Sequence, residues 1–123
     1  MISASNIYLV GPMGVGKTTV GKALAKSLGM DFIDSDQQIE DRTGVSISTI
    51  FDIEGEEGFR KREAQMIFEL VQKKNIVLAT GGGAVAREDV RKVMRHNGLV
   101  IYLHATVEML VERTRSSKNR PLL

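Results

Sequence analysis

The chain has 123 residues, a length that fits one domain with a single core. Hydrophobic residues make up 42% and charged residues 26%, which is typical of a globular protein and excludes a disordered or fibrous one. The formal charge of +2 is too small to indicate a nucleic-acid partner, and the absence of cysteine excludes disulfides, thiolate metal sites and cysteine nucleophiles.

The first predicted element is an apolar strand over Ile7–Val10, after which Gly11 opens a loop and a helix follows with apolar residues at helical spacing. Gly29 is placed to cap that helix. A second strand at Phe32 and Ile33 ends in the acidic sequence Asp34-Ser35-Asp36. The apolar N-terminal run is too short for a signal peptide or a membrane span, so we expect a cytoplasmic protein with no membrane partner.

The middle of the chain is predicted to be mainly helical. One or two short helices are expected over Ile39–Ile53, interrupted at Gly44 and capped by Ser46 or Ser48. A longer amphipathic helix is expected over Glu56–Lys74.

The third strand, Ile76–Ala79, ends in three glycines, Gly81 to Gly83. A helix with Val90, Val93 and Met94 then leads to a fourth strand over Leu99–Leu103, and a last helix is expected around Val107, Leu110 and Val111. Strands that alternate with helices indicate an α/β fold with a parallel sheet and helices on both faces. We expect one domain over residues 1–123, with a core over 1–111.

The strongest motif is GPMGVGKT, which places Gly11, Gly16, Lys17 and Thr18 in the GxxxxGKT pattern between a strand and a helix. Glycines let successive N–H groups face a phosphate, and the helix presents its positive end to the same anion. Lys17 is expected to reach the β- and γ-phosphates and the Thr18 hydroxyl to bind Mg²⁺. The motif predicts a nucleoside triphosphate site without fixing the reaction.

Two carboxylates, Asp34 and Asp36, follow the second strand. Ligands of open α/β sheets bind beyond the carboxyl ends of the strands, which gathers this pair, the phosphate loop and the glycine triplet into one crevice. We assign Asp34 to the metal and Asp36 to the acceptor hydroxyl, as a base. The alternative is that one of the two merely caps the next helix.

Arg60 and Glu63 are three residues apart on the predicted helix and therefore share a face. Glu63 could fix the Arg60 guanidinium, whose planar fork binds a carboxylate bidentately. The alternative is a solvated basic face, because Arg60 begins a run of three charged residues. The glycine triplet would let a polyhydroxylated ring approach the backbone closely, or would simply form a turn.

The motifs that carry a family resemblance are GPMGVGKT, DSD, GFRKRE, ATGGG and the late RPLL. Through them the chain resembles the shikimate kinase family from Ile7 to the last residue. The resemblance implies transfer of a phosphate from ATP to the 3-hydroxyl of shikimate, with Mg²⁺ as cofactor, in the route to the aromatic amino acids. It implies a monomer. It also implies that shikimate is bound by Asp36, Arg60, Gly81, Gly82 and Gly83, and ATP by Gly11, Met13, Gly14, Val15, Gly16, Lys17, Thr18, Thr19, Arg113 and Arg120.

Within that resemblance Lys17, Asp36 and Arg120 are the expected catalytic residues, and Thr18 and Asp34 the expected metal ligands. Residues 112–123 would begin the mobile lid of the family, with Arg113 against the adenine and Arg120 near the transferring phosphate. Members of the family continue through a further arginine, a strand and a closing helix, which we expect this chain to lack.

Two alternatives remain open at this point. One is a related P-loop kinase that acts on another hydroxylated acceptor, such as gluconate or a nucleotide. The other is a catalytically incomplete nucleotide-binding fragment. The pair Asp36 and Arg60 distinguishes a shikimate kinase from both alternatives. A binding module, in particular, has no need of a base and a carboxylate-binding arginine.

Overall fold

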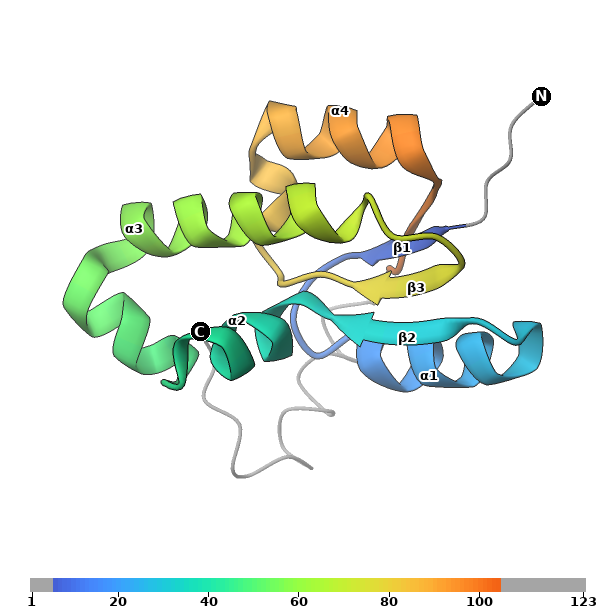
Figure 1. Ribbon diagram of the computed structural model, residues 1–123, viewed down its shortest axis with the longest axis horizontal. Helices are drawn as coiled ribbons and strands as arrows, with labels where there is room; N and C mark the ends of the chain where they lie inside the picture. Colours follow the sequence, from blue (N-terminus) through green and yellow to red (C-terminus); the bar gives the residue numbers. More distant parts are fainter. Residues whose placement is uncertain (1–5, 105–123) are drawn as a thin grey trace.

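A computed structural model of the chain describes residues 6–104. Its four strands form one parallel sheet in the order β2-β3-β1-β4 (Figure 1). The strands are β1 (Ile7–Val10), β2 (Asp31–Asp34), β3 (Ile76–Ala79) and β4 (Leu99–Tyr102). The helices are α1 (Lys17–Leu28), α2 (Ser35–Thr43), α3 (Ile47–Leu70) and α4 (Glu88–Asn97), with a short 3₁₀ turn, η1 (Ala84–Ala86).

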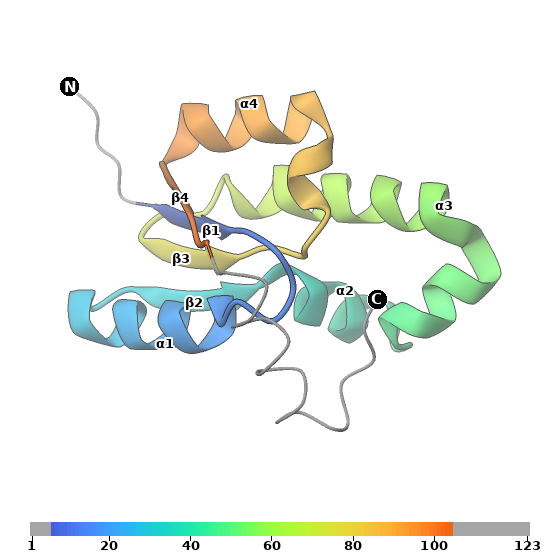
Figure 2. The same ribbon diagram turned by 180° about the vertical axis from the view of Figure 1, so that it is seen from behind.

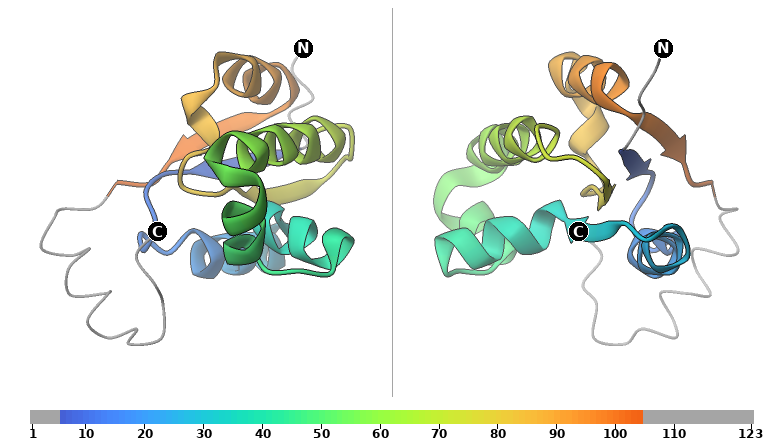
Figure 3. Two further views of the ribbon diagram at one scale, coloured as in Figure 1. Left: turned by 90° about the vertical axis from the view of Figure 1, so that its left-hand side faces the viewer. Right: turned by 45° about the vertical axis from the view of Figure 1, so that its right-hand side comes forward.

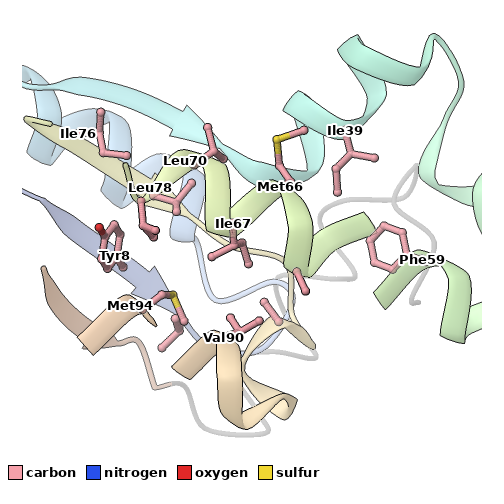
Figure 4. Packing of buried hydrophobic residues seen from close by; sticks show 14 of the residues in the cluster. Tyr8, Ile39, Phe59, Met66, Ile67, Leu70, Ile76, Leu78, Val90 and Met94 are labelled. Atoms are coloured by element: carbon pink, nitrogen blue, oxygen red, sulfur yellow. The ribbon is translucent and has the colours of Figure 1, made fainter. Parts of the chain in front are cut away.

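Helices cover both faces of the sheet, as the alternation of elements predicted (Figure 3). Residues that alternate along each strand point to opposite faces. On one face Tyr8 and Leu78 belong to the larger core, which α3 and α4 cover, and on the other Leu9 and Val77 pack with residues of α1. Figure 4 shows the larger core, where Ile67 of α3 lies among residues from the strands and from α4.

The parallel pairing brings the carboxyl ends of neighbouring strands to the same edge of the sheet. β1 lies between β3 and β4, with Leu9 opposite Ala79 on one side and Ile101 on the other. Asp34 at the end of β2 is opposite Ala79 of β3. Figure 2 shows the same sheet from behind, with β4 beside β1. Three segments that follow β1, β2 and β3 therefore start close together.

Helix ends follow the expected turn chemistry. Gly29 caps α1 and Gly44 caps α2, each with a left-handed backbone that a residue without a side chain adopts most easily. Ser46, rather than Ser48, caps α3, and its hydroxyl accepts a hydrogen bond from Thr49 N. Gly55 has φ 73° and ψ 178°, so that α3 bends there into two helical parts. The second part begins where the predicted long helix began.

Several predicted boundaries were wrong. The long helix ends at Leu70 rather than Lys74, because the amides of Gln72 and Lys73 bond to the third residue before them and Asn75 takes a left-handed φ of 62°. The helix expected from Ile39 already begins at Ser35. β4 ends at Tyr102 instead of Leu103, and β2 is longer than Phe32–Ile33 by one residue at each end.

No helix within residues 6–104 is long and apolar enough to cross a bilayer. The helix expected around Val107, Leu110 and Val111 lies outside the described residues, and so does the predicted lid.

Candidate active site

The site lies at the carboxyl ends of β1, β2 and β3. The structure brings the loop after β1, Asp36 after β2 and the glycine triplet after β3 to one cavity of about 450 Å³. This confirms that the three motifs converge. The cavity is lined by Pro12, Met13, Asp36, Ile47, Phe51, Glu56, Phe59, Arg60, Glu63, Gly81, Gly82 and Gly83.

The loop between β1 and α1 has the backbone that its glycines allow. Gly11, Gly14 and Gly16 have φ values of 144°, 82° and 94°, a region in which side chains are strained. No side chain caps α1 at Gly16, so the N–H groups of its first turn are available to an anion. This is the geometry expected of a phosphate loop.

Lys17 lies in the first turn of α1 with its ammonium over the loop. Its Nζ donates hydrogen bonds to Gly11 O at 2.6 Å and to Pro12 O at 3.0 Å. Burial lowers the pKa of Lys17, while the charges of Asp36 and Asp34 raise it. The carboxylates thus help to keep the ammonium charged in the place where a phosphate would lie.

Thr18 and Asp34 present oxygen atoms to each other. The Thr18 hydroxyl donates to Asp34 Oδ2 at 3.2 Å. Mg²⁺ prefers oxygen ligands and is commonly held by one or two protein groups together with substrate phosphates and waters. This donor pair fits that chemistry, and no group of three or more His, Cys, Asp or Glu within residues 6–104 could hold a metal ion by itself.

Asp34 also caps α2. Its Oδ1 accepts hydrogen bonds from the backbone N–H of Asp36 at 3.0 Å and of Gln37 at 3.3 Å. Asp34 therefore caps α2, as the alternative proposed, and also contacts Thr18. Asp36 lies in the first turn of α2 and not at the strand end, which corrects the sequence-based position.

Two carboxylates meet at Gly81. A methyl group built on Gly81 would approach Glu63 Oε2 to 2.6 Å and Asp36 Oδ1 to 2.9 Å. Both of these oxygens are buried and find no hydrogen-bond partner among residues 6–104. They are therefore unsatisfied acceptors of two residues that line the cavity.

The electrostatics of Asp36 suit a base. Burial, followed by the charges of Glu63 and Asp34, raises the pKa of its carboxyl to about 7, although Lys17 and Arg60 oppose the shift. A group with a pKa near neutrality exchanges protons most effectively at physiological pH.

The predicted pair of Arg60 and Glu63 is present. Arg60 Nη1 donates to Glu63 Oε1 at 2.9 Å, and the carboxylate is almost fully buried while the guanidinium is partly exposed. The solvated basic face proposed as an alternative is wrong for Arg60, because its guanidinium lines the cavity and lies against Gly83. Burial raises the pKa of Glu63, and its bond to Arg60 opposes that shift.

The apolar wall of the cavity was missed by the sequence analysis. Phe51 and Phe59 stack at 4.8 Å between ring centroids, and the Arg60 guanidinium lies 5.3 Å from the Phe59 ring. Ile47 adds a further apolar side chain to the lining of the cavity. No signal in the sequence separates these residues from core residues, because a helix presents cavity-lining and core side chains at the same spacing.

Two of the predicted site residues, Arg113 and Arg120, lie outside the described residues. All the others fall on the loop, on α1, α2 or α3, at the end of β2, where Asp34 lies, or on the glycine triplet. Gly82, the second glycine of the triplet, lies against the phosphate loop, because a methyl group built on it would lie 3.5 Å from Met13 N. The nucleotide side and the acceptor side of the site are thus in contact.

A parallel sheet that carries a phosphate loop beside a cavity lined by carboxylates defines the P-loop kinase class, in which a nucleotide and an acceptor meet at the strand ends. Residues 13–123 match the shikimate kinase family. The chain belongs to that family.

Relatives of the chain support this placement. The chain is 62% identical over 120 residues to a shikimate kinase of Chromobacterium violaceum, covering 98% of itself and 65% of the relative. It is 58% identical over 123 residues to one of Histophilus somni, covering 100% of itself and 70% of the relative. The chain thus spans about two thirds of the length of these curated relatives.

Solved structures agree. A shikimate kinase from Acinetobacter baumannii in complex with shikimate superimposes with a TM-score of 0.91 at 53% identity, covering 98% of this chain and 68% of that one. A gluconokinase from Sinorhizobium meliloti has a TM-score of 0.61 at 20% identity over 95% of this chain and 67% of that one, a likeness of fold alone.

Proposed function

We propose that this chain carries the nucleotide and acceptor sites of an ATP-dependent shikimate kinase, which transfers a phosphate from ATP to the 3-hydroxyl of shikimate. The observation that carries the proposal is the position of Asp36, on the cavity wall that includes the phosphate loop and close to Glu63 of the Arg60–Glu63 pair. A base and a fixed guanidinium in one cavity match an acceptor with both a hydroxyl and a carboxylate.

On the nucleotide side, the backbone N–H groups of the loop and of the first turn of α1 bind the phosphates of ATP, and Lys17 moves its ammonium from the loop carbonyls to a phosphate oxygen. Thr18 and Asp34 hold Mg²⁺, which neutralises phosphate charge when it is bound. Arg113 and Arg120, by resemblance to the family, bind the adenine and the transferring phosphate.

On the acceptor side, Arg60 binds the carboxylate through its planar fork, and the triplet Gly81 to Gly83 lets the ring approach the backbone. Asp36 accepts a hydrogen bond from the acceptor hydroxyl and takes its proton as the oxygen attacks the γ-phosphorus, whose bond to the β,γ-bridging oxygen breaks so that ADP leaves. The Phe51 and Phe59 wall covers the apolar side of the ring and excludes water. The chemistry therefore rests on positioning and charge, without a covalent intermediate.

The proposal also includes the setting in which the chain acts: a cytoplasmic monomer of one domain, with ATP and shikimate as its partners and no nucleic acid or membrane. Its low net charge of +2 supports a small-molecule partner.

A coupled assay of ADP release from Mg·ATP tests the proposal, with and without shikimate, on the 123-residue chain. We expect shikimate-dependent ADP release that is lost in Asp36→Asn and kept in Asp41→Asn, an exposed carboxylate on the same helix. Phosphorus NMR of the product identifies the esterified hydroxyl. ADP release that depends on gluconate instead would support the related-kinase alternative, and ATP binding without any transfer would support the incomplete fragment.

A further inference from the structure

Asp34 divides its two carboxylate oxygens between the two halves of the site. Oδ2 accepts from the Thr18 hydroxyl at 3.2 Å on the nucleotide side. On the acceptor side, Oδ1 accepts hydrogen bonds from Asp36 N at 3.0 Å and from Gln37 N at 3.3 Å. Both N–H groups belong to the first turn of α2, where a helix supplies no acceptor of its own. One side chain thus connects the phosphate loop to the helix that carries the acceptor-side carboxylate.

The side chain of Asp36 depends on its backbone for its position. Its Oδ1 is buried and without a hydrogen-bond partner among residues 6–104. The charges around its carboxyl act in opposite senses, because Glu63 and Asp34 repel it while Lys17 and Arg60 attract it. The place of the Asp36 carboxyl is therefore set by its backbone, and that backbone is fixed by the hydrogen bond to Asp34.

Asp34 is itself anchored to the sheet. It is the last residue of β2, in register with Ala79 of β3, the residue that precedes the segment leading to the glycine triplet. Ser35, the first residue of α2, is fully buried directly after it. An N-cap on a rigid strand gives the first turn of α2 a defined direction relative to Gly81.

We propose that Asp34 is a positioning residue for Asp36: through its Oδ1 cap it fixes the first turn of α2 and so holds the acceptor-side carboxylate in place, independently of a metal ion. The effect on acceptor binding rests on the proposed function. The effect on α2 does not, which separates the two in an experiment.

The test uses three substitutions in the 123-residue chain that divide capping from charge. Asn and Ser cap helices about as well as Asp, whereas Ala does not. We therefore compare Asp34→Asn, Asp34→Ser and Asp34→Ala, with Asp89→Ala as a control. Asp89 is a carboxylate in the first turn of α4, paired with Arg87 and away from the cavity.

The first measurement is amide hydrogen exchange at Asp36 and Gln37 in EDTA without nucleotide. We expect faster exchange in Asp34→Ala, by about fivefold, and protection within twofold of the original chain in Asp34→Asn, Asp34→Ser and Asp89→Ala. Unchanged protection in Asp34→Ala, or equal loss in all three Asp34 variants, would overturn the proposal.

The second measurement is calorimetric titration with shikimate under the same metal-free conditions. We expect about fivefold weaker binding in Asp34→Ala and less than twofold in the other three variants. Equal affinity in Asp34→Ala and the original chain overturns the link to acceptor binding. If the original chain does not bind shikimate while exchange follows the expected pattern, the proposed acceptor is wrong and the positioning of Asp36 by Asp34 stands.

Discussion

Arg60 and Glu63 form an ion pair in which the acid is more buried than the base: Arg60 Nη1 lies 2.9 Å from Glu63 Oε1, with the side chains 28% and 3% exposed. Glu63 therefore acts as a fixed support, and Arg60 presents the rest of its guanidinium to the cavity. A planar group held from behind keeps its orientation when a ligand carboxylate arrives.

Replacing Arg60 by lysine should weaken acceptor binding at least about tenfold, because an ammonium cannot bond Glu63 and grip a carboxylate bidentately at the same time. Calorimetric titration with shikimate measures this. The matched control is Arg62→Lys, two residues along α3, where the arginine binds Glu54 on the outer surface and does not line the cavity. Similar losses in the two variants would contradict the role given to Arg60.

Gly81 should tolerate no side chain. In Gly81→Ala the new methyl group would lie 2.6 Å from Glu63 Oε2 and 2.9 Å from Asp36 Oδ1, so that both buried carboxylates must shift. We expect the free energy of unfolding to fall by about 1–3 kcal/mol, as for other overpacked sites, in urea titrations.

Gly82→Ala is the comparison for that substitution, because its methyl group would meet its nearest neighbour, Met13 N, at an ordinary contact distance of 3.5 Å. We expect its unfolding free energy to stay within about 0.5 kcal/mol of the original chain. Equal destabilisation of the two alanine variants would mean that the crowding at Gly81 is not the cause.

Asp36→Asn should stabilise the chain at neutral pH. The pKa of Asp36 is raised from 3.8 to about 7 in the folded chain, so the folded state retains a proton that the unfolded state releases. Stability of the original chain therefore decreases as pH rises between these values, and the asparagine variant escapes that loss. We expect a difference of up to about 4 kcal/mol above pH 7 and less than about 1 kcal/mol near pH 4.

Urea unfolding at several pH values in EDTA measures this difference, with Asp41→Asn as the control for an exposed carboxylate of the same helix. A stability gain in Asp36→Asn that does not depend on pH would show that the effect comes from the amide itself and not from the titration of a buried carboxyl.

Lys17→Met should reduce the affinity for Mg·ADP by about thirtyfold, because the variant loses a charge-assisted hydrogen bond to a phosphate. Methionine keeps an unbranched side chain at this position. Lys22→Met is its control. Lys22 belongs to the same helix and lies over the Phe32 ring at 6.0 Å, outside the phosphate loop. Calorimetry gives both affinities, and nucleotide binding that survives in Lys17→Met would remove Lys17 from the site.

Much of the fold could be predicted because its signals are local. β1 and β3 were predicted with the bounds they have, since four-residue apolar runs that end in polar or glycine residues are typical of buried parallel strands. Gly29 and Gly44 marked helix ends because few other residues adopt a left-handed backbone at low cost. The end of α3 was missed because Val71 continues its apolar spacing although the chain has begun to turn.

Within the site, the phosphate loop and the Arg60–Glu63 pair could be predicted, since each depends on residues close in the sequence. The contact of Glu63 with Asp36 at Gly81 could not, because the three residues come from different elements that only the packing of α2 and α3 on the sheet brings together.

The sequence by itself determined which chemical groups are present: a glycine-rich loop with Lys17 and Thr18, two carboxylates at the end of β2 and the start of α2, an arginine with its supporting acid and a glycine triplet. Only the tertiary structure decided how those groups share space, namely that Asp34 contacts Thr18 of α1, and that burial raises the pKa of Asp36. The physical reason is that hydrogen bonding within a turn depends on near neighbours in the chain, whereas desolvation and repulsion depend on whatever the fold places around a group.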